Sequence, residues 1–168
     1  MRLAPALVLS LLLATPAAAV PAPKLHLSTL AELPVVVMRP YDESADADAQ
    51  VAAAFARARI SGKRVLIDLG GNWCGDCVVL ANLMALPQMK QFLADHFEIV
   101  SVDVGRFNKN LQIPARFGIT KRLKGVPAIL IVTPNGKTLV DAGHVSALED
   151  ARHMTPQGLA DWLAQWAK

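Results

Sequence analysis

The residues best suited to chemistry in this chain are its two cysteines, Cys74 and Cys77, which lie three positions apart in the stretch GGNWCGDC. A pair this close can act as a structural disulfide, as two metal ligands or as a reversible redox switch. A structural disulfide is the weaker interpretation, because closing so small a loop restricts the unfolded chain little.

A metal site is the second alternative. Zinc sites usually add another cysteine pair or a histidine pair. The four histidines are scattered along the chain without ligand spacing: His26, His96, His144 and His153. Each is better interpreted as a surface or packing residue. Two thiolates suit Cu(I), so a copper-binding or copper-assembly protein stays open as the alternative to redox chemistry.

The surrounding pattern places the pair between a strand and a helix. The apolar stretch RVLIDLG (64–70) predicts a buried strand, and a helical pattern begins at Gly75. Cys74 then lies at the helix start, where unpaired N–H groups and the helix dipole favour a thiolate. Cys77 lies one turn later on the same face. The first sulfur can attack a partner disulfide, and the second can resolve the mixed disulfide.

The rest of the chain alternates between helical and strand patterns. Gly62 ends one helical stretch, Pro87 kinks or divides another, and Thr155 with Pro156 begins the last. The segment 34–40 lies between two prolines and predicts an edge strand or an extended arm. The expected elements are helices over 44–60, 75–94, within 108–118 and over 155–168, and strands over 64–70, 97–104, 126–133 and 138–143.

This order predicts a single α/β domain with three layers and a central mixed sheet. The last two strands are expected to form an antiparallel hairpin around the turn PNGK (134–137). The length of 168 residues suits one domain with a real core. The composition, 53% hydrophobic and 18% charged, excludes a disordered chain.

The N-terminus predicts export. Residues 1–19 have an early arginine, a short apolar run and a small-residue end, which is typical of a secretory signal peptide. An uncleaved anchor is the alternative, although the run is short for a bilayer. We expect cleavage after Ala19, an N-terminal arm over 20–42 and a domain over 43–168. Cleavage leaves a formal charge of +2, too small to indicate nucleic-acid binding.

The stretch LIDLGGNWCGDC, with Asp68 on the upstream strand, Trp73 before the pair and GVP at 125–127, resembles the thioredoxin family. The resemblance covers the chain from about Val65 to its C-terminus. It implies the thioredoxin fold, with three α/β/α layers. With the signal peptide, the chain is most similar to exported members such as the C-terminal domain of the membrane disulfide reductase.

The resemblance also implies roles for the central residues. Cys74 matches the nucleophile, Cys77 matches the buried resolving cysteine, and together they form the redox-active disulfide. Asp68 matches the buried acid that helps to deprotonate the resolving cysteine. Burial raises the pKa of a carboxyl group toward neutrality, so such an acid can serve as a base near neutral pH. A merely hydrogen-bonded aspartate at a strand end is the alternative for Asp68.

Three further residues match supporting positions of the family. Trp73 matches the aromatic beside the site, with a core-filling role as its alternative. Pro127 matches the family's cis-proline, and Val126 then presents backbone to a partner chain.

The dipeptide between the cysteines departs from the family pattern, since Gly75-Asp76 replaces Gly-Pro. A negative charge at Asp76 should disfavour the thiolate and make the pair more reducing, unless that side chain points to water. Ser101 stands where the family has a lysine that partners the buried acid. Without that lysine, the pKa of Asp68 is expected to be less well adjusted for a base.

A third departure is the basic loop TKRLK, which brings Lys121, Arg122 and Lys124 toward the site. These side chains either lower the pKa of the nucleophile and meet an acidic partner, or form an ordinary solvated loop.

Together these features predict a periplasmic thiol–disulfide oxidoreductase of the protein-disulfide reductase or electron-carrier type. Its expected partners are protein disulfides and a membrane or soluble thiol donor, and we expect no cofactor, no resident metal, no nucleic acid and a monomer. The dipeptide lacks the histidine that would stabilise the thiolate of a strong oxidant, which favours the reducing direction. A disulfide oxidant, the Cu(I)-binding protein and an exchange-inactive binding module are the alternatives.

Overall fold

A computed structural model describes residues 20–168, so the signal peptide expected over 1–19 lies outside the described residues. The elements in order are a 3₁₀ helix η1 (Leu30–Glu32), α1 (Ala47–Ser61), β1 (Arg64–Gly70), α2 (Gly75–Met84), α3 (Pro87–His96), β2 (Phe97–Asp103), α4 (Gln112–Ala115), β3 (Ala128–Val132), a 3₁₀ helix η2 (Ala151–His153) and α5 (Pro156–Ala164).

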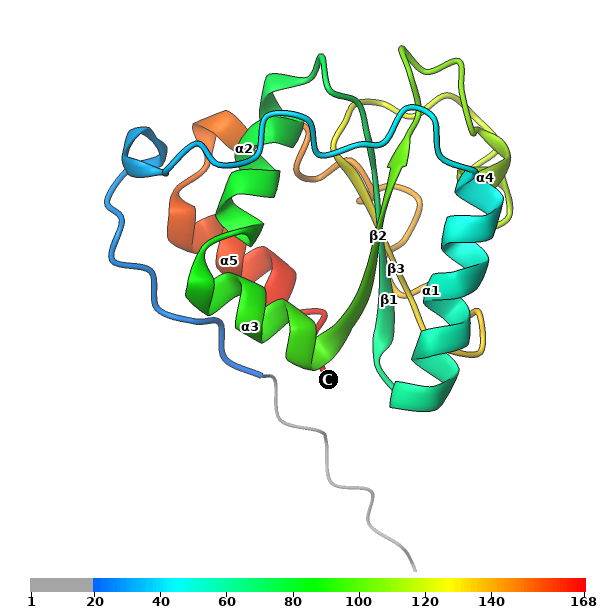
Figure 1. The fold of residues 1–168 in the computed structure, drawn as a ribbon, viewed down its shortest axis with the longest axis horizontal. Coiled ribbons are helices and arrows are strands. Elements are labelled where there is room, and N and C mark those ends of the chain that lie inside the picture. Colours follow the sequence, from blue (N-terminus) through cyan, green and yellow to red (C-terminus); the bar gives the residue numbers. More distant parts are fainter. Residues whose placement is uncertain (1–19) are drawn as a thin grey trace, which may run out of the picture.

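The three named strands form one mixed sheet in the order β2-β1-β3. β1 runs parallel to β2 and antiparallel to β3. Helix α1 covers one face of the sheet, and α2, α3 and α5 cover the other (Figure 1). The largest fully buried side chains of the sheet come from its central and antiparallel strands: Leu66, Ile67, Leu69, Ile129, Leu130 and Ile131. The predicted three-layer α/β class with a mixed sheet is confirmed.

Helix α1 begins and ends at recognisable caps. The carboxylate of Asp46 accepts a hydrogen bond from the N–H of Ala49, so the helix starts later than the predicted Ser44. At the other end Gly62 takes a left-handed conformation with φ 73° and donates its N–H to Ala58. The predicted glycine stop is confirmed, because only glycine adopts this φ without strain.

Pro87 divides the long helix predicted over 75–94. Helix α2 ends at Met84, and Pro87 starts α3 at the position where a missing N–H costs nothing. The two helices meet at an angle of 84°. Among residues 20–168, no single helix is long and apolar enough to cross a membrane.

The predicted fourth strand over 138–143 is wrong. The turn after β3 forms, but the chain then makes one isolated bridge, between Thr138 and Val132. The side chain of Asp141 accepts a hydrogen bond from the N–H of Gly143 at 2.9 Å. This local turn competes with strand pairing between the backbone hydrogen bonds that Leu139 and Val145 make to β3, so no continuous ladder forms.

The helix predicted within 108–118 is reduced to the single turn of α4. Phe107 and Asn110 both have positive φ, 64° and 52°, so the chain before α4 cannot be helical. The segment 34–40 forms no ladder and is the extended arm rather than the edge strand. In Figure 1 this arm crosses the end of the molecule from the side of α2 to the start of α1.

Candidate active site

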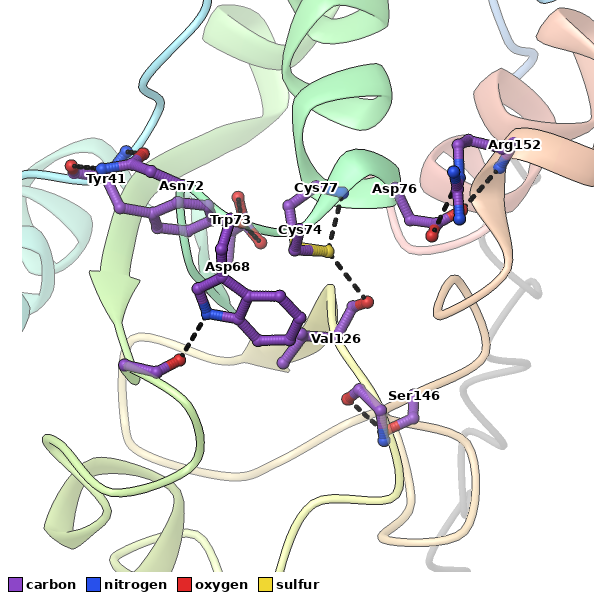
Figure 2. Close-up of a disulfide and its surroundings, with 12 residues drawn as sticks. Tyr41, Asp68, Asn72, Trp73, Cys74, Asp76, Cys77, Val126, Ser146 and Arg152 are labelled. Atoms are coloured by element: carbon purple, nitrogen blue, oxygen red, sulfur yellow. Dashed lines mark hydrogen bonds and ion pairs between the residues drawn. A yellow bond between two sulfur atoms is a disulfide. The ribbon is translucent and has the colours of Figure 1, made fainter.

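Cys74 and Cys77 form a disulfide at the start of α2, where the sequence predicted them. Cys74 is the N-cap residue of the helix, and the two Cα atoms lie 5.2 Å apart. The backbone N–H of Cys77 donates to Cys74 Sγ at 3.1 Å (Figure 2). An otherwise unpaired N–H of the first helical turn is thus directed at the sulfur, which favours negative charge there.

The two sulfurs differ in their access to solvent. Cys74 borders a surface cavity of about 450 Å³, whereas Cys77 is fully buried beneath it. The cavity is lined by Trp73, Cys74, Gly75, Asp76, Phe107, Gly125, Val126, Glu149 and Arg152. A partner molecule that enters the cavity therefore meets the sulfur of Cys74 first.

The backbone before β3 faces the disulfide. The carbonyl oxygen of Val126 lies 3.3 Å from Cys74 Sγ, and the Val126–Pro127 peptide bond is cis. The hydroxyl of Ser146 donates to the carbonyl of Gly125 at 3.0 Å and holds this turn in place. Val126 thus brings a main-chain acceptor to the sulfur.

Trp73 lies on the rim of the cavity. Its indole N–H donates to the carbonyl of Gly105 at 2.8 Å, which fixes the ring beside the pair (Figure 2). The ring meets Phe107 edge-on, and the guanidinium of Arg106 lies 4.9 Å from its centroid. With 44% of its surface exposed, Trp73 is a rim residue and does not fill the core.

Asp68 lies on β1, the strand that leads into the cysteine loop, and is 2% exposed. Burial raises the pKa of its carboxyl to about 7, although a hydrogen bond from Tyr41 opposes that rise. The phenol of Tyr41 donates toward both carboxylate oxygens, at 2.9 and 3.0 Å. A carboxyl with this pKa can take up and release a proton near neutral pH.

Tyr41 and Cys77 meet around Gly70, and the hydroxyl of Tyr41 also contacts Asp68. A Cβ added to Gly70 would overlap both the Tyr41 hydroxyl and Cys77 Sγ, so these two groups lie side by side. Tyr41 falls within the arm expected over 20–42, for which the sequence predicted no role in the site. The signal available was weak: it is the single tyrosine of the chain, directly after Pro40.

Asp76 is turned away from the sulfurs. Its carboxylate accepts the backbone N–H of Arg152 at 2.9 Å and pairs with the Arg152 guanidinium at 3.1 Å (Figure 2). The side chain therefore points neither at water nor at Cys74, and a positive charge faces it. Arg152 lies on η2, far along the chain, and no pattern in the sequence marked it as the partner of Asp76.

Ser101 stands opposite Asp68 in the parallel register of β1 and β2. Both residues line a second cavity, of about 470 Å³, that reaches the surface beside Lys90. Helix α3 supplies Lys90, so a basic residue does reach this cavity, from an element other than the strand on which the family resemblance placed its lysine.

The basic loop reaches the site through one residue. The guanidinium of Arg122 lies 4.6 Å from the ring centroid of Phe107, which itself lines the cavity of Cys74. Lys121 and Lys124 line a separate cavity of about 500 Å³.

Three of the histidines, His96, His144 and His153, each contact a different partner. His96 lies 2.7 Å from the carbonyl of Lys168, and His144 lies 2.7 Å from the carboxylate of Asp141. Within residues 20–168, no three histidine, cysteine or acidic side chains gather where they could hold a metal ion.

Comparisons with known proteins agree with this geometry. The chain is 31% identical over 121 residues to the thiol:disulfide interchange protein DsbD 1 of Pseudomonas aeruginosa. That match covers 71% of this chain and 19% of DsbD 1, so the chain spans about a fifth of the relative.

Among solved structures, a disulphide isomerase from Xylella fastidiosa Temecula1 is 36% identical with a TM-score of 0.70. It covers 75% of this chain and 95% of its own. The C-terminal domain of Neisseria meningitidis DsbD in its oxidised form is 21% identical, covers 65% of this chain and 97% of its own, and has a TM-score of 0.42. A family model described as thioredoxin-like matches residues 46–134, more than half of the chain. The chain belongs to the thioredoxin-like family.

Proposed function

We propose that this protein is a periplasmic thiol–disulfide oxidoreductase that works as a protein-disulfide reductase or electron carrier. The observation that carries the proposal is the unequal placement of the two sulfurs. Cys74 borders an open cavity, while Cys77 is buried beside the hydroxyl of Tyr41, which contacts an acid whose pKa is about 7. Exchange needs this asymmetry, because one sulfur must meet the partner and the other must wait for the mixed disulfide.

The proposed reaction transfers two electrons. In the reduced protein, the Cys74 thiolate attacks one sulfur of a partner disulfide, and the partner's other sulfur leaves as a thiolate. Asp68 then takes the proton of Cys77, and the Cys77 thiolate attacks Cys74 Sγ. The partner's remaining sulfur leaves, and the protein holds the Cys74–Cys77 disulfide. A second thiol donor reduces this disulfide and restores the dithiol.

The reducing direction is supported by the dipeptide between the cysteines. Gly75 and Asp76 offer no cationic side chain to stabilise the thiolate, as the histidine of a strong oxidant would. The pairing of Asp76 with Arg152 weakens the predicted repulsion between the Asp76 carboxylate and the Cys74 thiolate. We therefore propose a reduction potential that is low, as in a reductase, but not extreme.

The location and partners follow from the same proposal. The leader expected over 1–19 supports export, and the DsbD relative is named for thiol–disulfide interchange. We propose protein disulfides as substrates, a membrane or soluble thiol protein as donor, and a monomeric working form. The open cavity at Cys74 supports a macromolecular partner, because its rim combines exposed aromatic, acidic and basic side chains.

The reduction potential of the Cys74–Cys77 pair tests the direction. Equilibration with defined thiol buffers should give a value near that of thioredoxin, about −270 mV. A value near about −120 mV would instead make the protein an oxidant. A pair that stays in one state across the whole range would contradict the redox function.

Trapping tests the exchange itself. The Cys77→Ser variant should accumulate mixed disulfides through Cys74, and the Cys74→Ser variant is the matched control that should accumulate none. An absence of trapped partners, together with stoichiometric Cu(I) binding by the reduced protein, would favour the copper-binding alternative.

A further inference from the structure

We propose that Tyr41 is a positioning residue that holds the Asp68 carboxylate ready to take the proton of Cys77, and that the arm before α1 is thereby part of the active site. This inference rests on the proposed exchange function. It goes beyond that function by assigning a role to a residue outside the cysteine pair and its neighbouring strand.

The contact between the two side chains is close and enclosed. Tyr41 and Asp68 are each 2% exposed, and the phenol hydroxyl lies 2.9 Å and 3.0 Å from the two carboxylate oxygens. A hydroxyl centred between both oxygens orients the carboxyl group and stabilises its charged form. Without a donor, a carboxyl buried this deeply keeps its proton to higher pH, so a smaller fraction is ionised and free to accept a proton near neutral pH.

The arm that carries Tyr41 is held by two asparagine side chains. Asn72, in the loop before Cys74, accepts the N–H of Tyr41 at 3.0 Å and donates to its carbonyl at 2.9 Å. Asn82 on α2 accepts the N–H groups of Val36 and Val37 at 2.7 and 2.8 Å and donates to the carbonyl of Val37 at 2.8 Å. The cysteine loop and the cysteine helix thus hold the arm at separate points, which fixes the phenol over Asp68.

The surrounding charges suit a donor role for the phenol. Burial, followed by the charge of Asp68 and then that of Asp103 on β2, raises the pKa of Tyr41 well above its usual value, so the hydroxyl keeps its proton. Lys90 on α3 borders the cavity that Asp68 also lines. Cys77 on α2 places its Sγ beside the Tyr41 hydroxyl. Strand β3 contributes the apolar Ile129 opposite Asp68. Cys77 Sγ and the Asp68 carboxyl are thus both neighbours of the Tyr41 hydroxyl, which makes Cys77 the proton donor of the proposed step.

The step moves one proton. Cys77 Sγ–H gives its proton to Asp68, which becomes neutral, and the Cys77 thiolate attacks Cys74 Sγ. Tyr41 keeps its own proton throughout, because its hydroxyl can donate to the ionised carboxylate and to the carbonyl oxygen of the neutral acid.

The test is the Tyr41→Phe variant, which keeps the ring and removes the hydroxyl. In protein labelled with carbon-13 at aspartate carboxyl groups, Asp68 should titrate about one pH unit higher in Tyr41→Phe than in the wild type. The acid limb of the pH profile for resolution of a mixed disulfide should move by the same amount. An unchanged Asp68 titration would overturn the proposal.

Two further variants separate the hydroxyl from the rest of the arm and from the function. Arg39→Ala, on the exposed side of the arm, should leave the Asp68 titration in place, and an equal shift there would contradict a specific role of the hydroxyl. In an Asp68→Asn background, Tyr41→Phe should not slow resolution further, whereas a further loss would show that Tyr41 acts elsewhere. The carboxyl titration needs no exchange activity, so it tests Tyr41 even if the proposed function fails.

Discussion

Asp76 and Arg152 bind each other twice: the carboxylate accepts the backbone N–H of Arg152 at 2.9 Å and pairs with its guanidinium at 3.1 Å. The aspartate side chain is 11% exposed and the arginine side chain 57% exposed, so solvent screens part of the interaction. An acidic residue inside the cysteine motif therefore has a specific partner. The charge that the sequence placed next to the thiolate is partly offset by an arginine on another element.

The first prediction concerns this pair. Arg152→Ala leaves Asp76 without its cation, which destabilises the thiolate of the reduced protein. The reduction potential should fall by about 10 to 20 mV, in line with the small free energy of a partly exposed ion pair. Asp76→Asn should raise the potential instead, and Arg152→Lys, which keeps the charge, should lie close to the wild type. Equilibration with glutathione measures all three, and a rise in Arg152→Ala would contradict the account.

The second prediction concerns stability against pH. Burial raises the pKa of Asp68 to about 7, above its unfolded value, so between about pH 4 and pH 7 the folded chain holds a proton that the unfolded chain releases. The contribution of this proton to the free energy of unfolding is fully present below about pH 4, and it is lost as the pH rises through 7.

Asp68→Asn removes this dependence and still offers Tyr41 an acceptor. In the oxidised protein it should be more stable than the wild type by about 2 to 4 kcal/mol at pH 8 and equally stable near pH 4. Urea unfolding at both pH values measures the difference. A gain of the same size at both would point to packing and not to ionisation.

The third prediction concerns the arm. Asn82→Ala removes the side chain that satisfies the backbone of Val36 and Val37, and it should cost about 2 kcal/mol of unfolding free energy. Hydrogen exchange over 34–41 should become faster. Arg39→Ala is the matched control on the same arm, because its exposed pair with Glu43 contributes little. Equal losses in both variants would exclude the asparagine as the anchor.

The fourth prediction concerns the close approach at Gly70. Gly70→Ala adds a methyl group where the Tyr41 hydroxyl and Cys77 Sγ already lie, and it should cost about 1 to 3 kcal/mol. Gly143→Ala, on an exposed loop, should change stability by less than about 0.5 kcal/mol. Thermal unfolding of the oxidised proteins compares them. A tolerated Gly70→Ala would show that Tyr41 and Cys77 leave room for a methyl group between them.

Local signals in the sequence predicted much of the fold. Gly62, Pro87 and Thr155 mark helix ends that depend on the backbone preferences of single residues, and each acts where expected. The strand and helix around the cysteines were predictable for the same reason. The fourth strand was not, because a side-chain turn at Asp141 competes with edge pairing, and hydrophobic pattern alone does not show which prevails.

Some residues of the candidate site could likewise be predicted from the sequence, and others could not. The disulfide of Cys74 and Cys77 was predictable, and Asp68 could be proposed as their acid, because their types and spacing carry the family resemblance. Tyr41 and Arg152 were missed because they contact the site across 27 and 76 residues of sequence, and no local pattern marks such a contact. The basic loop was expected near the site as a group, whereas one of its three side chains reaches a residue of the cavity, through an aromatic ring.

The course of the arm has a consequence for how the unit can be transplanted. The cysteine pair, its helix and its acid all lie within 68–84, so they look like a portable cassette. A version starting at residue 43 would carry that cassette without its phenol, and Asn72 and Asn82 would lose the backbone they bind. The smallest fragment that carries the complete site therefore starts upstream of α1, at the arm residues that Asn82 holds. A graft or fusion joined at α1 would contain the two sulfurs and Asp68 without the hydroxyl that orients the carboxylate.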